Sequence, residues 1–534
     1  MRLAAGALVF VISGCAVTDP RDPPLFGPPQ EPQQSGEQAE TDAVLAETPE
    51  GNPVVVVGHR YTGPSHLNND EEQPFDIVYG GSNDAGVAFL RGSSIMGWSY
   101  SLNGGLAWEA PGKIYPENGV FGDPVAVLWS DPALASGFVN RSLVAYASLA
   151  GSTQAFNAVT GGTDTADILF GWPPSVDRPD FPGPDDFGII DSLCVAVSFD
   201  GGINFERPVC KRPAGIGASG TDQTTVAIGA GDRIYVAVDD FSNEEVRLFE
   251  LIYTGEPAPF LSPISMPAEM IGFQHGPELR RDQDGFVWLA AVDGLGSIAM
   301  CLVTSSGCQF IGSVTTGTDF FATVPGGIVS PEPLRSGSSA DFGVNRVSLD
   351  GLTVREFIFA YTRQDAQREI TGLTRCFLFS IQGTLSCEDV AAWGSASRAG
   401  QHLQPNIEFV DKSPEQDGSG ADWRYAFYEF DRPDVAQGHA QVTLGRMSGA
   451  LPSTLAPSVT FFPLTALDPE VCPADYPTFD YWGDYFALLA LPPIAPSTSW
   501  RHMAAYSSDE SRGCAPAHPR QGRHLHVVAW SWQD

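Results

Sequence analysis

The chain has 534 residues, of which 57 are glycine and 43 are proline, and its formal net charge at pH 7 is −35. This charge argues against nucleic-acid binding, because phosphate backbones require a basic protein face. It also argues against electrostatic attachment to anionic lipid. Abundant glycine and proline with few long helical periods indicate an all-β fold of short strands and turns.

The first fourteen residues have the layout of a secretory signal. Arg2 precedes an apolar run from Leu3 to Ile12, which is too short to span a bilayer as a helix. The run ends in Ile12-Ser13-Gly14-Cys15, which resembles a bacterial lipobox whose cysteine carries the lipid. The residue after Cys15 is alanine, not aspartate, which by the same resemblance favours the outer membrane. The alternative is an ordinary signal peptide with an incidental cysteine. We therefore expect a signal peptide at 1–14 and a lipoprotein of the cell envelope, periplasmic or surface-exposed.

Residues 15–40 contain the lipidated cysteine and a stretch rich in proline, glutamine and acid. Such a composition buries too little apolar surface to offset the entropy of ordering, so it predicts a disordered tether. Residues 41–534 form the folded body, within which 151–190 is predicted to be an insertion loop.

Seven segments of the body share one pattern, in which a polar start leads into an apolar strand, a turn and a second strand. They begin near residues 41, 122, 221, 275, 403 and 482, with a weaker copy that ends at 355–362. Repeated sheets of this kind are stable only when each buries its faces against its neighbours. The pattern predicts a β-propeller of six or seven four-stranded antiparallel blades, with seven favoured. The apolar strand at 524–532 is suited to closing the ring.

Two further segments read S-x-[DN]-G-G-x-x-[WF]. The motif predicts a tight turn in which the Asp or Asn accepts backbone N–H bonds, the glycines take positive φ, and the aromatic residue packs beneath. Its residues are Ser101, Asn103, Gly104, Gly105 and Trp108, and then Ser198, Asp200, Gly201, Gly202 and Phe205. Together with the strand repeats, it resembles the Asp-box (BNR-repeat) of the sialidase-like propeller superfamily. The resemblance covers about 41–534 and implies that these residues are structural, not catalytic.

The chain contains nine cysteines, and eight remain for disulfides if Cys15 carries the lipid. None of the neighbouring pairs has the CxxC spacing of a zinc site, and the first three pairs bracket hairpin-like segments. We predict disulfides Cys194–Cys210, Cys301–Cys308 and Cys376–Cys387, and a fourth between Cys472 and Cys514.

Polar residues that open the inner strands would ring the central channel of a propeller, where ligands bind. The candidate ligand-binding residues are Asp123, Asp222, His275, Gln404, Asp484 and Tyr485. The alternative is that these residues hydrogen-bond neighbouring blades and only order the channel.

No metal or cofactor is expected. Two weaker patterns are compatible with metal binding: an H-x-H pair with a nearby histidine, and a run of aspartates in the insertion loop that could bind calcium through oxygen. These residues are His518, His524 and His526, and then Asp164, Asp167, Asp177, Asp180, Asp185 and Asp186.

Two functions remain open. The favoured one is a non-catalytic, monomeric propeller that binds a glycan or a protein. The alternative is a glycoside hydrolase or lyase that uses channel carboxylates. A sialidase needs an arginine triad and a Tyr–Glu nucleophile. The family's Arg-Ile-Pro motif is absent, while Tyr428-Glu429 and Tyr485 are candidate nucleophile residues. Only one residue of the Arg280-Arg281 pair could serve the channel, because adjacent strand residues face opposite sides.

Overall fold

The computed structural model describes residues 25–26 and 38–531 with gaps, the longest of which are 62–76, 169–189, 316–339, 464–486 and 509–523. Strands dominate the described part, and its one α-helix is α1 (Thr153–Thr160). No helix among the described residues combines the length and apolar character needed to cross a membrane.

In the described part of the chain, five sheets are four-stranded antiparallel meanders whose strands pair in chain order. The first sheet contains β2 (Gln38–Glu47), β3 (Pro53–Tyr61), β6 (Met96–Ser101) and β7 (Gly112–Lys113), and the second contains β15 (Thr221–Ile228), β16 (Ile234–Asp240), β17 (Glu245–Ile252) and β18 (Phe260–Ile264). The third contains β19 (His275–Arg281), β20 (Val287–Val292), β21 (Ser297–Thr304) and β22 (Gly307–Thr315), and the fourth contains β23 (Ala340–Leu349), β24 (Leu352–Asp365), β25 (Arg368–Leu378) and β26 (Ser386–Asp389). The fifth contains β27 (Gln401–Val410), β28 (Asp422–Phe430), β29 (Gln441–Ser448) and β30 (Ser458–Pro463).

Two other sheets depart from this form. In one, β10 (Ala133–Ser136) and β9 (Val125–Leu128) both pair with β11 (Val144–Ser152), followed by β13 (Ser192–Ser198), β14 (Val209–Lys211) and the parallel strand β8 (Phe121–Gly122). In the other, β31 (Ala487–Leu491), β32 (Arg501–Ser508) and β33 (His524–Ser531) are joined by β1 (Leu25–Phe26) from the N-terminal segment. A separate three-stranded sheet pairs β12 (Thr165–Ile168), β5 (Val87–Leu90) and β4 (Ile77–Tyr79).

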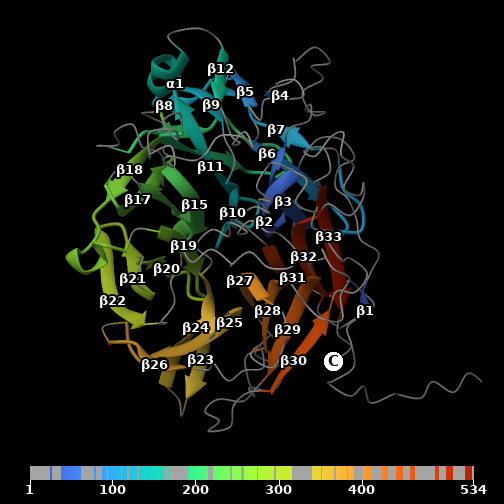
Figure 1. Cartoon of the computed structure of the whole chain (residues 1–534), viewed down its shortest axis with the longest axis vertical. Coiled ribbons are helices and arrows are strands. Elements are labelled where there is room, and N and C mark those ends of the chain that lie inside the picture. The colour runs from blue at the N-terminus through green and yellow to red at the C-terminus, as the bar shows by residue number, and fades with distance from the viewer. Residues whose placement is uncertain are drawn as a thin grey trace, which may run out of the picture.

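The sheets are arranged radially as a β-propeller (Figure 1). Their first strands contact one another in the closed series β2, β10, β15, β19, β23, β27, β31 and back to β2. The expected six or seven regular blades are corrected to five in the described residues. The reasons are local: the inner strand against β11 is divided into β9 and β10, and the outer strand of the last sheet comes from the other end of the chain.

Two predicted segments also differ from expectation. The tether at 15–40 contains β1 and the start of β2, so it is not entirely without structure. The insertion loop at 151–190 begins with α1 and contains β12, which pairs with β5 from a different insertion. Pairing with a second insertion supplies the hydrogen-bond partners that a lone loop would lack.

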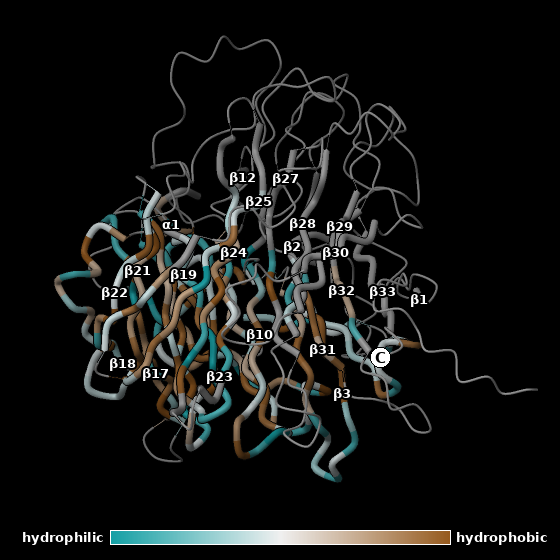
Figure 2. The backbone as a smooth tube through the Cα atoms, turned by 90° about the horizontal axis from the view of Figure 1, so that it is seen from below, coloured by the Kyte–Doolittle hydropathy of each residue, from teal (hydrophilic) through white to brown (hydrophobic). Residues whose placement is uncertain are grey.

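Apolar residues fill the spaces between neighbouring sheets. One buried cluster joins the β11 and β16 sheets through residues such as Val195 and Val236, and another joins the β20 and β24 sheets through Trp288 and Phe357. Figure 2 shows hydrophobic residues along the strands and hydrophilic residues gathered in turns at strand ends. Each sheet thus buries both faces against its neighbours, as the repeat pattern predicts.

The two S-x-[DN]-G-G segments fold into the same turn, each between the third and fourth strands of a sheet. In the second copy, Gly202 donates its N–H to Ser198 Oγ (2.8 Å), and Asp200 Oδ1 accepts the N–H groups of Ile203 (3.1 Å) and Asn204 (2.9 Å). The first copy repeats these bonds with Ser101, Asn103, Gly105, Leu106 and Ala107. The glycines have positive φ, and Phe205 packs edge-on against Trp98. The predicted turn geometry is confirmed.

Three predicted disulfides are confirmed, and each joins the third and fourth strands of its sheet. They are Cys194–Cys210, Cys301–Cys308 and Cys376–Cys387. The fourth predicted pair, Cys472 and Cys514, lies outside the described residues.

Candidate functional site

The central channel contains acidic side chains that begin the inner strands. Asp42 on β2 accepts the N–H of Ala43 at Oδ1 (2.7 Å) and the N–H of Leu134, on β10 of the next sheet, at Oδ2 (2.6 Å). One carboxylate therefore fixes the local strand and connects two sheets. Backbone N–H groups are obligatory donors, so such a bond orders both partners.

The same arrangement recurs around the ring. Asp341 on β23 accepts the N–H of Phe342 (2.7 Å) and the N–H of Ile407 on β27 (2.8 Å). Asp131 accepts the N–H of Gln223 (3.1 Å), and Thr225 Oγ1 accepts the N–H of Leu279 (3.0 Å). We refer to Asp42, Asp131, Thr225 and Asp341 as the inter-sheet acceptors.

Four charged residues of β2, β19 and β23 interact inside the channel, and we call Asp42, Glu278, Arg280 and Asp341 the channel cluster. Arg280 donates from Nη1 to Glu278 Oε1 (2.9 Å) and from Nη2 to Asp341 Oδ1 (2.8 Å). Its Nε also donates to the carbonyl of Phe342 (3.3 Å). The guanidinium is thus held by two carboxylates and one backbone oxygen.

Burial raises the pKa of two acids of the channel cluster. The pKa of Glu278 rises to about 8, mainly through burial, with Asp341 and Asp42 adding repulsion against the opposing effect of Arg280. The pKa of Asp42 rises to about 6 through burial, although the Leu134 N–H and Arg280 act in the opposite direction. These two carboxyl groups can therefore hold protons near neutral pH.

A second pair of acids lies where β15 begins. Asp222 is directly opposite Asp239 on β16, and burial together with the Asp222 charge raises the pKa of Asp239 well above its usual range. Gly276, next to His275, donates its N–H to Asp239 Oδ2 (3.2 Å). The structure thus places the start of β15, with the predicted Asp222, beside the start of β19.

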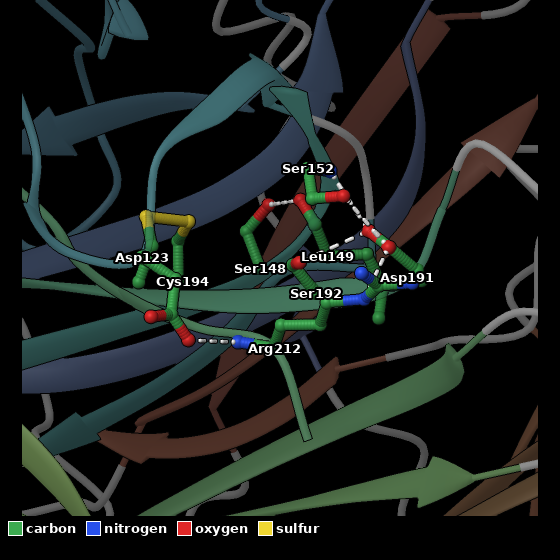
Figure 3. Close-up of a disulfide and its surroundings, with 9 residues drawn as sticks. Asp123, Ser148, Leu149, Ser152, Asp191, Ser192, Cys194 and Arg212 are labelled. Carbon is green, nitrogen blue, oxygen red and sulfur yellow. Dashed lines mark hydrogen bonds and ion pairs between the residues drawn. A yellow bond between two sulfur atoms is a disulfide. The ribbon is translucent and has the colours of Figure 1, made fainter. Parts of the chain in front are cut away.

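The predicted position of Asp123 in the channel is corrected. Asp123 follows β8, which pairs with β14 on the outer side of its sheet, so the residue lies near the periphery. Its carboxylate forms an ion pair with Lys211 (3.4 Å) and accepts the N–H of Arg212 (2.9 Å). Figure 3 shows this carboxylate beside the Cys194–Cys210 disulfide.

The side chain of Arg212 forms an ion pair with Asp191, a buried acid in the same region. Arg212 Nε lies 2.8 Å from Asp191, whose oxygens also accept the hydroxyl of Ser152 (2.7 Å) and that of Ser192 (3.0 Å), as Figure 3 shows. This network attaches the start of the insertion to the body of the sheet and is structural.

The remaining predicted ligand-binding residues are His275, Gln404, Asp484 and Tyr485. His275 and Gln404 lie on the inner strands β19 and β27, as predicted, while Asp484 and Tyr485 lie outside the described residues. Tyr428 and Glu429 lie on β28, a second strand.

The weaker metal patterns fall mostly outside the described residues. This holds for His518, Asp164, Asp177, Asp180, Asp185 and Asp186, whereas Asp167 lies on β12 and His524 and His526 lie on β33. Among the residues described, no group of three or more His, Cys, Asp or Glu side chains is placed to hold a metal ion.

Sequence reasoning missed the acids that connect the sheets, although a signal was present. Asp42, Asp131 and Asp341, like the predicted Asp222, each follow a small residue at or near the start of an inner strand. Aligning the strand starts on this aspartate would have identified all three. Glu278 carries no comparable signal, because its role depends on burial beside Arg280.

The protein is a β-propeller whose central channel contains charged side chains that form ion pairs with one another. No family model matches the chain, and no curated protein matches it. Similar solved structures include the intramolecular trans-sialidase from Ruminococcus gnavus (10% identity, TM-score 0.38, covering 82% of this chain and 96% of that one) and a leech intramolecular trans-sialidase (10%, 0.37, 84% and 71%). Another is the polysaccharide lyase Uly1 (9%, 0.36, 95% and 100%). At this distance the likeness identifies neither substrate nor reaction.

Proposed function

We propose that the protein is an exported, membrane-anchored β-propeller that binds a glycan or protein ligand at its channel without cleaving it. The proposal rests on the groups to which the channel acids are hydrogen-bonded. Asp42 and Asp341 accept backbone N–H groups from neighbouring sheets, and Asp341 is also bound to Arg280. Carboxylates fixed in this way order the channel, whereas a glycosidase needs a free pair beside an open pocket.

We also propose that the two irregular sheets serve as the sixth and seventh positions of the ring. The contacts of β10 with β2 and β15, and of β31 with β27 and β2, support this arrangement.

A second candidate function, hydrolysis or elimination of a glycan, has one observation in its favour. Glu278 and Asp42 have pKa values of about 8 and about 6, which suit proton donors near neutral pH. A general acid also requires access to its substrate, and Glu278 is already bound to Arg280.

A glycan array combined with a hydrolysis screen tests the two candidates. We expect binding to one glycan or protein class with no release of reducing sugar, and no release of sialic acid from a fluorogenic sialoside. Cleavage that Glu278→Gln abolishes, while Asp123→Asn at the periphery leaves it intact, would establish the enzymatic alternative.

The anchoring proposal rests on Cys15 and the apolar run before it. Cys15→Ala is expected to move the protein from the membrane pellet to the soluble fraction. Its thermal unfolding should not change, because the substitution leaves every residue of the folded body intact. A variant that still pelleted with membranes would contradict the anchor.

A further inference from the structure

A cavity of about 450 Å³ lies at the far end of the inner strands from Asp42 and Asp222. Its wall includes the last residues of β2, Ser136 at the end of β10, and Arg280 and Arg281 at the end of β19. The volume falls within the range of small-molecule sites. The cavity therefore adjoins the channel cluster, with which it shares Arg280, on the side away from the strand starts.

Most charges in the cavity wall are compensated by a nearby partner. Arg141 forms an ion pair with Glu47 (2.9 Å), and Arg280 is bound to two acids of the channel cluster. Asp282 accepts Arg355 Nε (2.6 Å). Each of these charges is balanced within the protein, so none of them requires a ligand.

Arg281 differs from the other cations of the wall. Its Nη1 donates to the carbonyls of Ser136 (2.7 Å) and Ile228 (2.9 Å), and its guanidinium lies 5.4 Å from the ring centre of Phe138. No carboxylate among the described residues forms an ion pair with it. The nearby Asp232 is occupied by the backbone N–H groups of residues 138–140.

The charge of Arg281 is only partly compensated, and from a distance. Burial lowers the pKa of Arg281 and the positive charge of Arg141 acts in the same direction, whereas the charges of Asp232 and Asp282 oppose the shift. An arginine nevertheless stays protonated, so the wall carries one positive charge without a direct acidic partner. This is unexpected in a chain of net charge −35, in which acids outnumber bases by 64 to 29.

We infer that this cavity binds a small molecule through one carboxylate group, which pairs with the guanidinium of Arg281. A planar guanidinium matches a carboxylate in geometry, and an ionised pair forms strong hydrogen bonds. Glu47 and Asp282 in the same wall disfavour a dianion such as sulfate. Phe138 and the apolar Val344 and Ile407 offer surface for the body of the ligand.

Calorimetric titration of the full chain with four probes tests the inference. The probes are D-glucuronate, its neutral counterpart D-glucose, L-lactate and sulfate. We expect one or both carboxylates to bind at least ten-fold more tightly than glucose. Binding of both carboxylates indicates recognition of the acid group alone, and binding of glucuronate only indicates a sugar acid. Equal or tighter binding of sulfate, or no preference over glucose, would overturn the inference.

Variants separate a binding role from a folding role. Arg281→Gln is expected to weaken carboxylate binding about 10- to 100-fold, since it removes a charge-assisted pair. Arg281→Lys retains the charge without the planar fork and should weaken binding less, and it serves if the glutamine variant does not fold. Arg233→Gln is the matched control, because Arg233 is half exposed and pairs with Glu250 outside the cavity. Unchanged binding in both Arg281 variants would overturn the assignment.

Discussion

Replacing Asp341 by alanine should destabilise the propeller strongly at the junction of β23 and β27. The substitution leaves the N–H of Ile407 without its acceptor, and the backbone of Ile407, a residue only 1% exposed, is out of reach of water. An unsatisfied buried donor costs about 1–3 kcal/mol. Arg280 also loses one of its two carboxylates; its side chain is 32% exposed and keeps Glu278, so the total stays below the upper end of the about 3–5 kcal/mol that breaking a fully buried pair costs.

Urea unfolding of the oxidised protein, followed by tryptophan fluorescence, measures this loss. Asp341→Asn retains one oxygen acceptor and is expected to cost less, about 1–2 kcal/mol. Glu245→Gln is the control, because Glu245 is one-third exposed and its pair with Arg247 is a surface pair worth about 0–1 kcal/mol. If Asp341→Ala lowered stability by no more than this control, and hydrogen exchange of the Ile407 amide were unchanged, the inter-sheet acceptor would have no structural importance.

Three further predictions concern the pH response, the turns and the last disulfide. The folded pKa of Glu278, about 8, exceeds its ordinary value of 4.5, so the stability from its protonation is complete below pH 4.5 and disappears as pH rises to about 8. Urea midpoints at pH 5 and 8.5 should therefore differ less in Glu278→Gln than in the wild type; an equal difference would contradict the raised pKa. Gly202→Ala should cost about 1–3 kcal/mol, because φ is +89° and a Cβ would lie 2.4 Å from a valine methyl of β3. Gly51→Ala, with φ +83° and no atom within 4 Å, isolates the backbone part of this cost. Non-reducing peptide mapping should recover Cys472 linked to Cys514, and free thiols at either position would disprove the pair.

Local patterns predicted much of the fold. Strand alternation, the S-x-[DN]-G-G turns and three cysteine pairs depend on residues close in sequence, and the structure confirms these features. The division of an inner strand into β9 and β10 and the addition of β1 to β33 depend on partners distant in sequence, so composition gave no sign of them.

The site was predicted less well than the fold, for a related reason. A polar residue at a strand start is visible in sequence, but whether it faces the channel depends on which strand is innermost. Asp123 precedes an apolar run like the others, yet β8 pairs on the outer side of its sheet. The raised pKa of Glu278 and the position of Arg281 without an ion-pair partner among the described residues arise from burial and from neighbours on other sheets, which no local motif encodes.

The pairing of β1 with β33 also constrains how the protein can be made. Leu25 lies opposite Ser531, so the two halves of this junction are about 500 positions apart and leave the ribosome at opposite ends of translation. The ring cannot be sealed while the chain is still being synthesised. Until β33 is made, β1 has no strand to pair with, and the edge of β32 that β33 later covers is open to pairing with other chains. Products that terminate before β33 would keep these unpaired edges, which favours their aggregation.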